Sequence, residues 1–98
     1  MVTEVAQVEI HDGNIEDFLK ALTNSVGLLQ ETKGFISIEV QHQIENPSIV
    51  YLIIKWAQLD DHLIGFRQSE KFVLWRNSLG KFFKSEPIVN HFEKVNIG

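Results

Sequence analysis

Aromatic rings and cationic side chains gather in the stretch 56–83, which reads WAQLDDHLIGFRQSEKFVLWRNSLGKFF. An arginine beside a ring can stack on it, or bind an anionic or carbonyl oxygen inside an otherwise apolar small-molecule pocket. Rings at helical spacing also suit an ordinary core, so both interpretations stay open. If the stretch forms a binding slot, we expect Arg76 to contact the ligand and the slot to be shaped by Trp56, Phe66, Phe72 and Trp75.

Three histidines are candidates for the proton transfer that chemistry in such a slot would need. His62 follows two aspartates at the expected start of a helix, where an exposed position is the simplest alternative. His42 and His91 share the faces of predicted strands with apolar residues and could equally be satisfied core or interface histidines. No two histidines have the i, i+4 spacing of a helical metal site, and the chain has no cysteine. We therefore expect neither a bound metal nor another cofactor.

The elements that must position these residues follow from the apolar periodicity. Apolar and polar residues alternate over 2–10 and 36–41, which predicts two strands. Between them, Ile15, Phe18 and Leu22 begin a helical period that continues through Leu19, Val26 and Leu29, with Asn14 as the expected N-cap. The turn 45–48 predicts a hairpin into a third strand over 49–56. A second helical region and a strand over 87–95 complete the order βαββαβ.

Within the second helical region, two apolar stripes are predicted. One comprises Leu59, Leu63 and Phe66, and the other comprises Phe72, Trp75 and Leu79. Arg67 lies beside the first stripe, and we interpret it as a solvated surface charge.

The third predicted strand is apolar on both faces, with Leu52 and Ile54 on one side and Tyr51 and Ile53 on the other. The order βαββαβ is that of the ferredoxin-like α+β fold, an antiparallel sheet with both helices on a single face. That fold leaves the second face of the sheet uncovered. We therefore predict a homodimer in which an identical subunit covers Tyr51 or Ile53.

Composition narrows the class of protein further. The 98 residues fit a single domain, 1–98, and 44% of them are hydrophobic, as in an ordinary globular protein. A net charge of −4 without a basic stripe argues against a nucleic-acid partner. No phosphate-binding glycine loop, dinucleotide fingerprint or nucleophile elbow is present. The start, MVTEVAQVEI, reads as a strand and not as an export or membrane signal, so we predict a cytoplasmic protein.

The run DHLIGFRQSEKFVLWR resembles the second-helix signature of the antibiotic biosynthesis monooxygenase family. The resemblance extends from the first strand, 4–10, through GFISIEVQHQIENPSIVYLIIKW to PIVNHFEKV. It implies a dimeric α/β barrel, in which two sheets pack face to face, and a pocket for planar aromatic or quinone-like molecules. The activity that it implies is oxidation of an electron-rich phenol or quinol by dioxygen without metal or flavin.

The chain departs from two groups within that family. At the positions where haem-degrading members carry asparagine, tryptophan and an axial histidine, this chain carries Ala6, Phe66 and Arg76. Arginine stays protonated and cannot be an ordinary iron ligand, so we expect no haem degradation. Many quinol-type members carry a histidine at the position of Phe66, so proton transfer here would fall to His62, His42 or His91.

Two hypotheses of function remain. The first is a cofactor-independent monooxygenase that acts on a small aromatic, quinol or polyketide-like phenol in a pocket between helices and sheet. The second is a dimeric, non-catalytic small-molecule-binding or stress-response module of the same fold, which the phenylalanine at position 66 favours.

Overall fold

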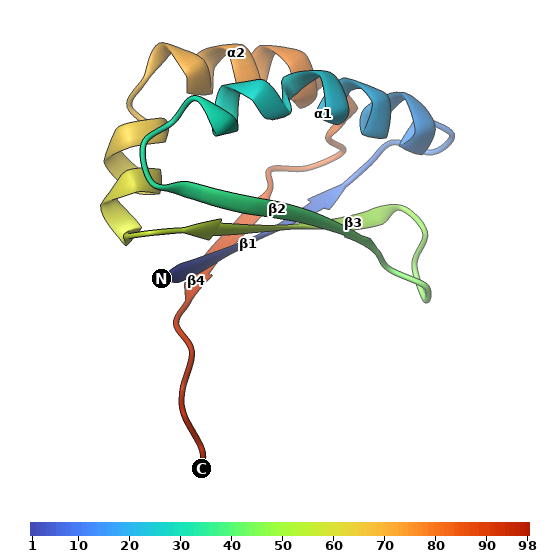
Figure 1. The fold of residues 1–98 in the computed structure, drawn as a ribbon. Coiled ribbons are helices and arrows are strands. Elements are labelled where there is room, and N and C mark those ends of the chain that lie inside the picture. The colour runs from blue at the N-terminus through green and yellow to red at the C-terminus, as the bar shows by residue number, and fades with distance from the viewer.

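The computed structural model describes residues 1–98 as an antiparallel sheet with both long helices on one face (Figure 1). The elements are β1 (Val2–Glu9), α1 (Ile15–Gln30), β2 (Phe35–His42), β3 (Ile49–Trp56), the π-helical turn η1 (Asp61–Phe66), α2 (Glu70–Leu79), the 3-10 turn η2 (Gly80–Phe82) and β4 (Ile88–Phe92). The strands lie in the order β2-β3-β1-β4, and all neighbours are antiparallel. This arrangement confirms the predicted ferredoxin-like fold. No helix is long and apolar enough to cross a membrane.

The register of β1 decides which side chains reach the space under the helices. β1 pairs with both β3 and β4, so Ala6 lies between Leu52 and Val89, and Glu4 lies between Ile54 and His91. Because side chains alternate across a strand, Glu4 and Ala6 share the helix-facing side of β1. A carboxylate is therefore carried into the apolar layer by the same alternation that builds the core.

Helix α1 buries a narrower stripe than its apolar residues predict. Phe18, Leu22 and Leu29 are buried, but Leu19 is exposed and Val26 only half-buried. Ser25 is buried in their place, and its hydroxyl donates to the carbonyl of Ala21 at 2.8 Å, which satisfies the hydroxyl inside the helix. Asn14 precedes the helix as expected, but its side chain makes no capping hydrogen bond.

The second helical region differs from expectation in its first half. It begins with the π-helical turn η1, in which the backbone N–H of Arg67 donates to the carbonyl of His62 at 2.9 Å. This wider turn buries His62 and Phe66, four residues apart, whereas Leu59 is 40% exposed. Of the predicted stripe, Phe66 is buried and Leu63 half-buried, but Leu59 is exposed and His62 takes its place on the buried face. The stripe that ends in Trp75 and Leu79 is confirmed.

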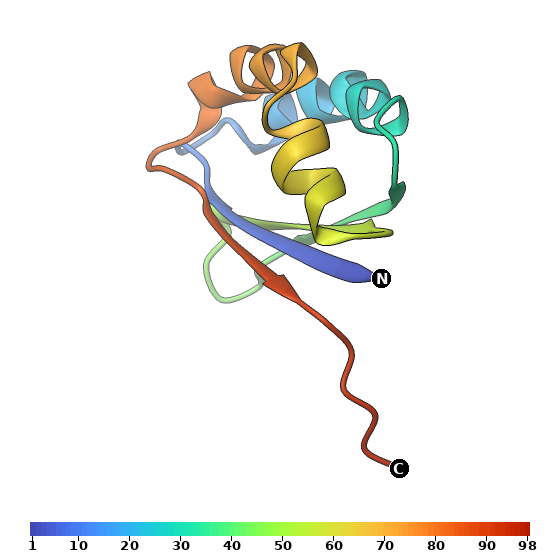
Figure 2. The same cartoon turned by 90° about the vertical axis from the view of Figure 1, so that its left-hand side faces the viewer.

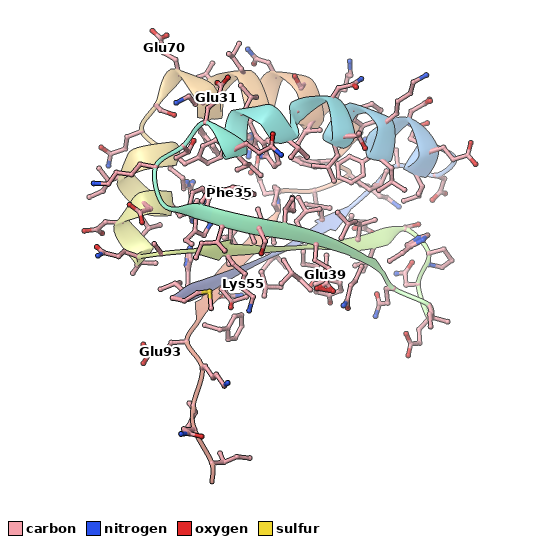
Figure 3. All side chains as sticks on the ribbon, in the orientation of Figure 1. Glu31, Phe35, Glu39, Lys55, Glu70 and Glu93 are labelled. Carbon is pink, nitrogen blue, oxygen red and sulfur yellow. The ribbon has the colours of Figure 1, made fainter.

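The face of the sheet opposite to the helices combines apolar and polar side chains. Tyr51 and Ile53 are half-buried there, and the Tyr51 hydroxyl donates to Gln7 Oε1 at 3.3 Å. Lys55 Nζ donates to Thr3 Oγ1 at 2.8 Å, and the side chains of Glu39 and Lys55 lie on this helix-free side (Figure 3). No element of the chain covers this face (Figure 2).

β4 is shorter than the predicted strand over 87–95. It ends at Phe92, which pairs with Thr3 at the beginning of β1, so no partner strand remains for the residues that follow. The remaining residues extend away from the body of the molecule (Figures 1 and 2).

Candidate functional site

A cavity of about 280 Å³ lies between the helix-facing side of the sheet and the second helical region. A cavity of about 150 Å³ is enough to hold benzene, so this one has room for one or two aromatic rings. Its walls are mainly apolar, and five charged or titratable side chains interrupt them. The lining residues are Ala6, Val8, Leu52, Ile54, Phe66, Phe72, Trp75, Phe83, Pro87 and Val89, together with Glu4, His62, Arg67, Arg76 and Glu86.

The aromatic wall is built around Phe66. Its ring meets Phe72 edge-on at 5.6 Å between centroids and Trp75 edge-on at 5.8 Å. Edge-to-face contacts hold rings in fixed relative orientations, so these three rings form a fixed aromatic wall of the cavity. Three of the four aromatic residues expected to shape a slot therefore line the cavity.

Trp56, the fourth, does not line the cavity because it is fully buried behind His62. The ring of Phe35, at the start of β2, packs edge-on against Trp56 at 5.9 Å, and Phe35 lies on the helix-facing side in Figure 3. Trp56 instead acts on the site through its indole, whose Nε1–H donates to Glu4 Oε1 at 2.9 Å. Trp56 therefore supports Glu4 and does not form part of the cavity wall.

Glu4 is a carboxyl group buried in the cavity wall and only 5% exposed. Burial raises its pKa to about 7, and the hydrogen bond from Trp56 and the positive charge of Arg67 oppose that rise without cancelling it. A carboxyl group with a pKa near neutrality exchanges its proton readily at physiological pH, which is the property of a general acid–base group.

His62 lies directly beside Glu4 and is also buried. Its ring stacks on Trp56, with 5.3 Å between centroids and 22° between planes, and its Nε2 is 3.3 Å from Glu4 Oε1. Burial lowers the pKa of His62 to about 4, and the neighbouring His91 and Arg67 add to the effect. The two shifts favour a neutral imidazole beside a neutral carboxyl group, so the 3.3 Å contact is not an ion pair.

His91 continues this chain of contacts on β4. His91 Nε2 is 2.8 Å from His62 Nδ1, and the rings lie 5.0 Å apart. His91 is half-buried, and burial together with the charge of Arg67 lowers its pKa. Its side chain borders a second, open hollow on the surface, which Val2, Leu59, Phe92 and Glu93 also line.

Two arginines border the cavity. The guanidinium of Arg76, expected as the ligand contact, makes two 3.4 Å contacts with the carboxylate of Glu86. Arg67, expected to be a solvated charge, is exposed, but it also lines the cavity and its guanidinium lies 5.3 Å from the centre of the Phe72 ring. Both guanidinium groups therefore border the cavity, and that of Arg76 is paired with Glu86.

The predicted histidines are separated by the fold. His62 and His91 come together, but His42 is exposed at the end of β2, where its Nε2 contacts the carbonyl oxygen of Pro47 in the hairpin. His42 is not part of the cavity wall. No group of three or more histidine, aspartate or glutamate side chains is arranged to hold a metal ion.

Sequence reasoning missed Glu4 as a site residue. The signal that pointed to it was positional: Glu4 precedes Ala6, Val8 and Ile10 at a spacing of two residues, so it lies on the buried face of its strand. A charged residue in that register is rarely buried without a partner.

The fold and the cavity define a small α+β domain with an aromatic-lined pocket between sheet and helices. Residues 1–78 match the family described as antibiotic biosynthesis monooxygenase, and the chain belongs to this family. It is 30% identical over 95 residues to the uncharacterized protein YczJ of Bacillus subtilis (strain 168), a match that covers 97% of this chain and all of YczJ.

Solved structures agree with this assignment. A putative antibiotic biosynthesis monooxygenase from Bordetella bronchiseptica superimposes with a TM-score of 0.94 at 29% identity, over 97% of both chains. SnoaB, a cofactor-independent oxygenase from Streptomyces nogalater whose structure was solved in a mutant form, superimposes with a TM-score of 0.81. It is 14% identical over 98% of this chain and 94% of that chain, so it supports the fold alone.

Proposed function

We propose that this protein is a cofactor-independent monooxygenase that oxidises a small phenol, quinol or polyketide-like aromatic molecule in the cavity. The observation that carries this proposal is the buried carboxyl group of Glu4, hydrogen-bonded to Trp56 and beside His62, in the wall of an aromatic slot. Family membership supports the reaction type, and the cavity volume favours substrates of one or two rings.

The first step is ionisation of the substrate. The Glu4 carboxylate takes the proton of the phenol, which makes the ring electron-rich enough to give electrons to dioxygen. The charges of Arg67 and Arg76 at the cavity wall stabilise the resulting phenolate. The apolar remainder of the cavity excludes water, which strengthens these charge interactions and protects reactive intermediates.

Oxygen transfer then needs only the substrate and dioxygen. A carbon–oxygen bond forms at the ring carbon para to the phenolate, and Glu4 returns its proton to the peroxide. The same ring carbon next loses its hydrogen as a proton to Glu4 while the O–O bond breaks and hydroxide leaves. Glu4 protonates the hydroxide, so one phenol and one dioxygen give one para-quinone and one water. The substrate supplies all the electrons, and Glu4 ends in its initial state.

The proposal is tested by oxygen uptake with a panel of phenols, quinols and hydroxyanthracenes. We expect Glu4→Gln to lower the turnover rate by roughly 10²- to 10⁴-fold, the usual contribution of a general acid–base group, while the substrate still binds. His42→Gln is the matched control, because His42 lies outside the cavity and its loss should leave the rate unchanged. An unchanged rate in Glu4→Gln would remove Glu4 from the mechanism.

Arg76 and Arg67 are compared as ligand contacts in the same panel. We expect Arg76→Ala and Arg67→Ala each to weaken binding of a phenolate or quinone ligand more than they lower thermal stability, because both side chains border the cavity without being buried. Isothermal titration measures the affinity and calorimetric melting the stability. If Arg76→Ala unfolds the protein without changing the affinity of the folded fraction, Arg76 is a structural partner of Glu86.

A second candidate is a non-catalytic binding module of the same fold. Phe66 favours it, because this buried ring carries no transferable proton at the position where quinol-type members carry histidine. The oxygen electrode separates the two candidates. Compounds that bind in the cavity without any enzyme-dependent oxygen uptake would establish the binding module and refute the monooxygenase.

We also propose that the protein functions as a homodimer. The helix-free face of the sheet presents half-buried Val5, Tyr51 and Ile53 and exposed Ile88 and Phe92, which a second sheet would cover. Sedimentation at micromolar concentration should give a mass of twice 11.3 kDa. A stable monomer under those conditions would contradict the proposal.

A further inference from the structure

The row of side-chain contacts formed by Glu4, His62 and His91 joins two separate openings of the molecule. Glu4 and His62 line the main cavity, whereas His91 lines the second hollow. The three groups come from three different elements, β1, η1 and β4, and they touch end to end at 3.3 Å and 2.8 Å. The row therefore leads from the interior to the surface.

His62 engages both of its ring nitrogens in this row. Nε2 is directed to Glu4, and Nδ1 is directed to His91. An imidazole that accepts a proton at one nitrogen and releases the proton of the other carries a net proton across its ring without rotating. Stacking on Trp56 holds the ring in place.

We propose that Glu4, His62 and His91 form a proton relay between the cavity and the second hollow. Its use in turnover rests on the proposed function, but its contacts exist without substrate and can be tested without it. The relay connects Glu4 with water while the cavity is closed by a bound aromatic molecule.

The atoms balance along the row. When Glu4 is protonated, its O–H donates to His62 Nε2, His62 Nδ1–H donates to His91 Nε2, and His91 carries its proton on Nδ1. When Glu4 loses its proton, that proton moves to His62 Nε2, the Nδ1 proton of His62 moves to His91 Nε2, and the Nδ1 proton of His91 passes to water. The carboxylate of Glu4 then accepts from His62 Nε2–H, and both histidines have changed tautomer.

Other charged groups around the row set its working range. Arg67, at the end of η1, opposes a positive charge on either histidine and favours the carboxylate of Glu4. Arg76 and its partner Glu86 lie across the main cavity, and Glu93 borders the second hollow. The low pKa of His62 keeps its imidazole neutral, so the proton passes through His62 and does not accumulate on it.

The first test uses the resting protein labelled with ¹⁵N-histidine. Long-range proton–nitrogen spectra between pH 6 and 9 identify the protonated nitrogen of each ring. We expect His62 and His91 to switch together from Nδ1–H to Nε2–H, with the midpoint at which the Glu4 carboxyl signal titrates. In Glu4→Gln, whose amide does not titrate, both rings should keep one tautomer over the whole range. Fixed tautomers in the unsubstituted protein while Glu4 titrates would overturn the relay.

The second test follows turnover in His91→Ala, with His42→Ala as the control. We expect kcat to fall roughly tenfold or more with KM unchanged, because Glu4 that is protonated in the closed cavity must release its proton through His91 before it can take the proton of the phenol. Added imidazole should restore part of kcat by taking the place of the missing ring. Oxidation at an unchanged kcat in His91→Ala would also overturn the relay. If no compound is oxidised at all, the proposed function fails and the tautomer spectra alone decide the relay.

Discussion

Replacing Glu4 with glutamine should stabilise the protein above pH 7 and change its stability little at low pH. Burial raises the pKa of Glu4 from its ordinary value of 4.5 to about 7. Between these pH values the folded chain binds more protons than the unfolded chain, so the free energy of unfolding falls as pH rises. Each unit of pKa difference corresponds to about 1.4 kcal/mol, so ionised Glu4 costs about 3 kcal/mol above pH 7. Glutamine carries no charge and avoids this cost, and its amide oxygen still accepts from Trp56.

His62 contributes a slope of the opposite sign. Burial lowers its pKa from 6.5 to about 4, so the unfolded chain binds more protons between these values and the free energy of unfolding rises with pH. In the unsubstituted protein the two slopes largely cancel between about pH 4.5 and 6.5. In Glu4→Gln the His62 slope remains, and His91, whose pKa is also lowered by burial, adds a slope of the same sign. The stability of this variant should therefore rise from about pH 4 to 6.5, stay level above that, and exceed that of the unsubstituted protein at pH 8.

Urea unfolding at several pH values between 4 and 9, followed by tryptophan fluorescence at one fixed protein concentration, measures these curves. Glu45→Gln, at an exposed hairpin position, is the matched control and should change the free energy of unfolding by less than about 0.5 kcal/mol. A Glu4→Gln protein that is equally or less stable at pH 8 would refute the assignment of Glu4 as a buried group that is costly to ionise.

Four further outcomes are expected. Gly34→Ala should cost more than about 1 kcal/mol of stability, because Gly34 has a φ of 87° and a Cβ there would run into the side chain of Asp61 at the start of η1. Gly27 lies inside α1 with nothing near its Cβ position, so Gly27→Ala should instead raise the free energy of unfolding by about 1 kcal/mol. Equal losses of stability in both variants, measured in the same urea titrations, would contradict this reasoning. Trp75→Ala should lower the free energy of unfolding by about 3–5 kcal/mol, because it removes a buried ring from the cavity wall. Calorimetric melting measures this loss, and an unchanged Tm would show that the ring is not part of the core. Haem should bind without a sharp Soret band in spectroscopic titration, because Arg76 stands at the expected ligand position. A sharp band with one haem per chain that disappears when a single histidine is replaced would contradict this expectation.

The order of elements and the fold class could be predicted because they depend on local periodicity. Alternation in the strands and the helical period of α1 are visible over a few residues, and the structure confirms both. The stripe ending in Trp75 and Leu79 was predictable for the same reason. The π-helical turn η1 was not, because a regular helical period was the only spacing that the sequence suggested for Leu59, Leu63 and Phe66.

The sequence by itself therefore determined the ferredoxin-like architecture, the aromatic character of the second helical region, and His62 and His91 as separate candidates. Only the tertiary structure decided that these two histidines meet, that His42 stands apart, and that Glu4 joins them. The physical reason is that the contacts join residues far apart in the chain, 29 positions from His62 to His91 and twice as many from Glu4 to His62. Strand register and the wide turn η1 set these distances, and the raised pKa of Glu4 follows from a burial that no local pattern specifies.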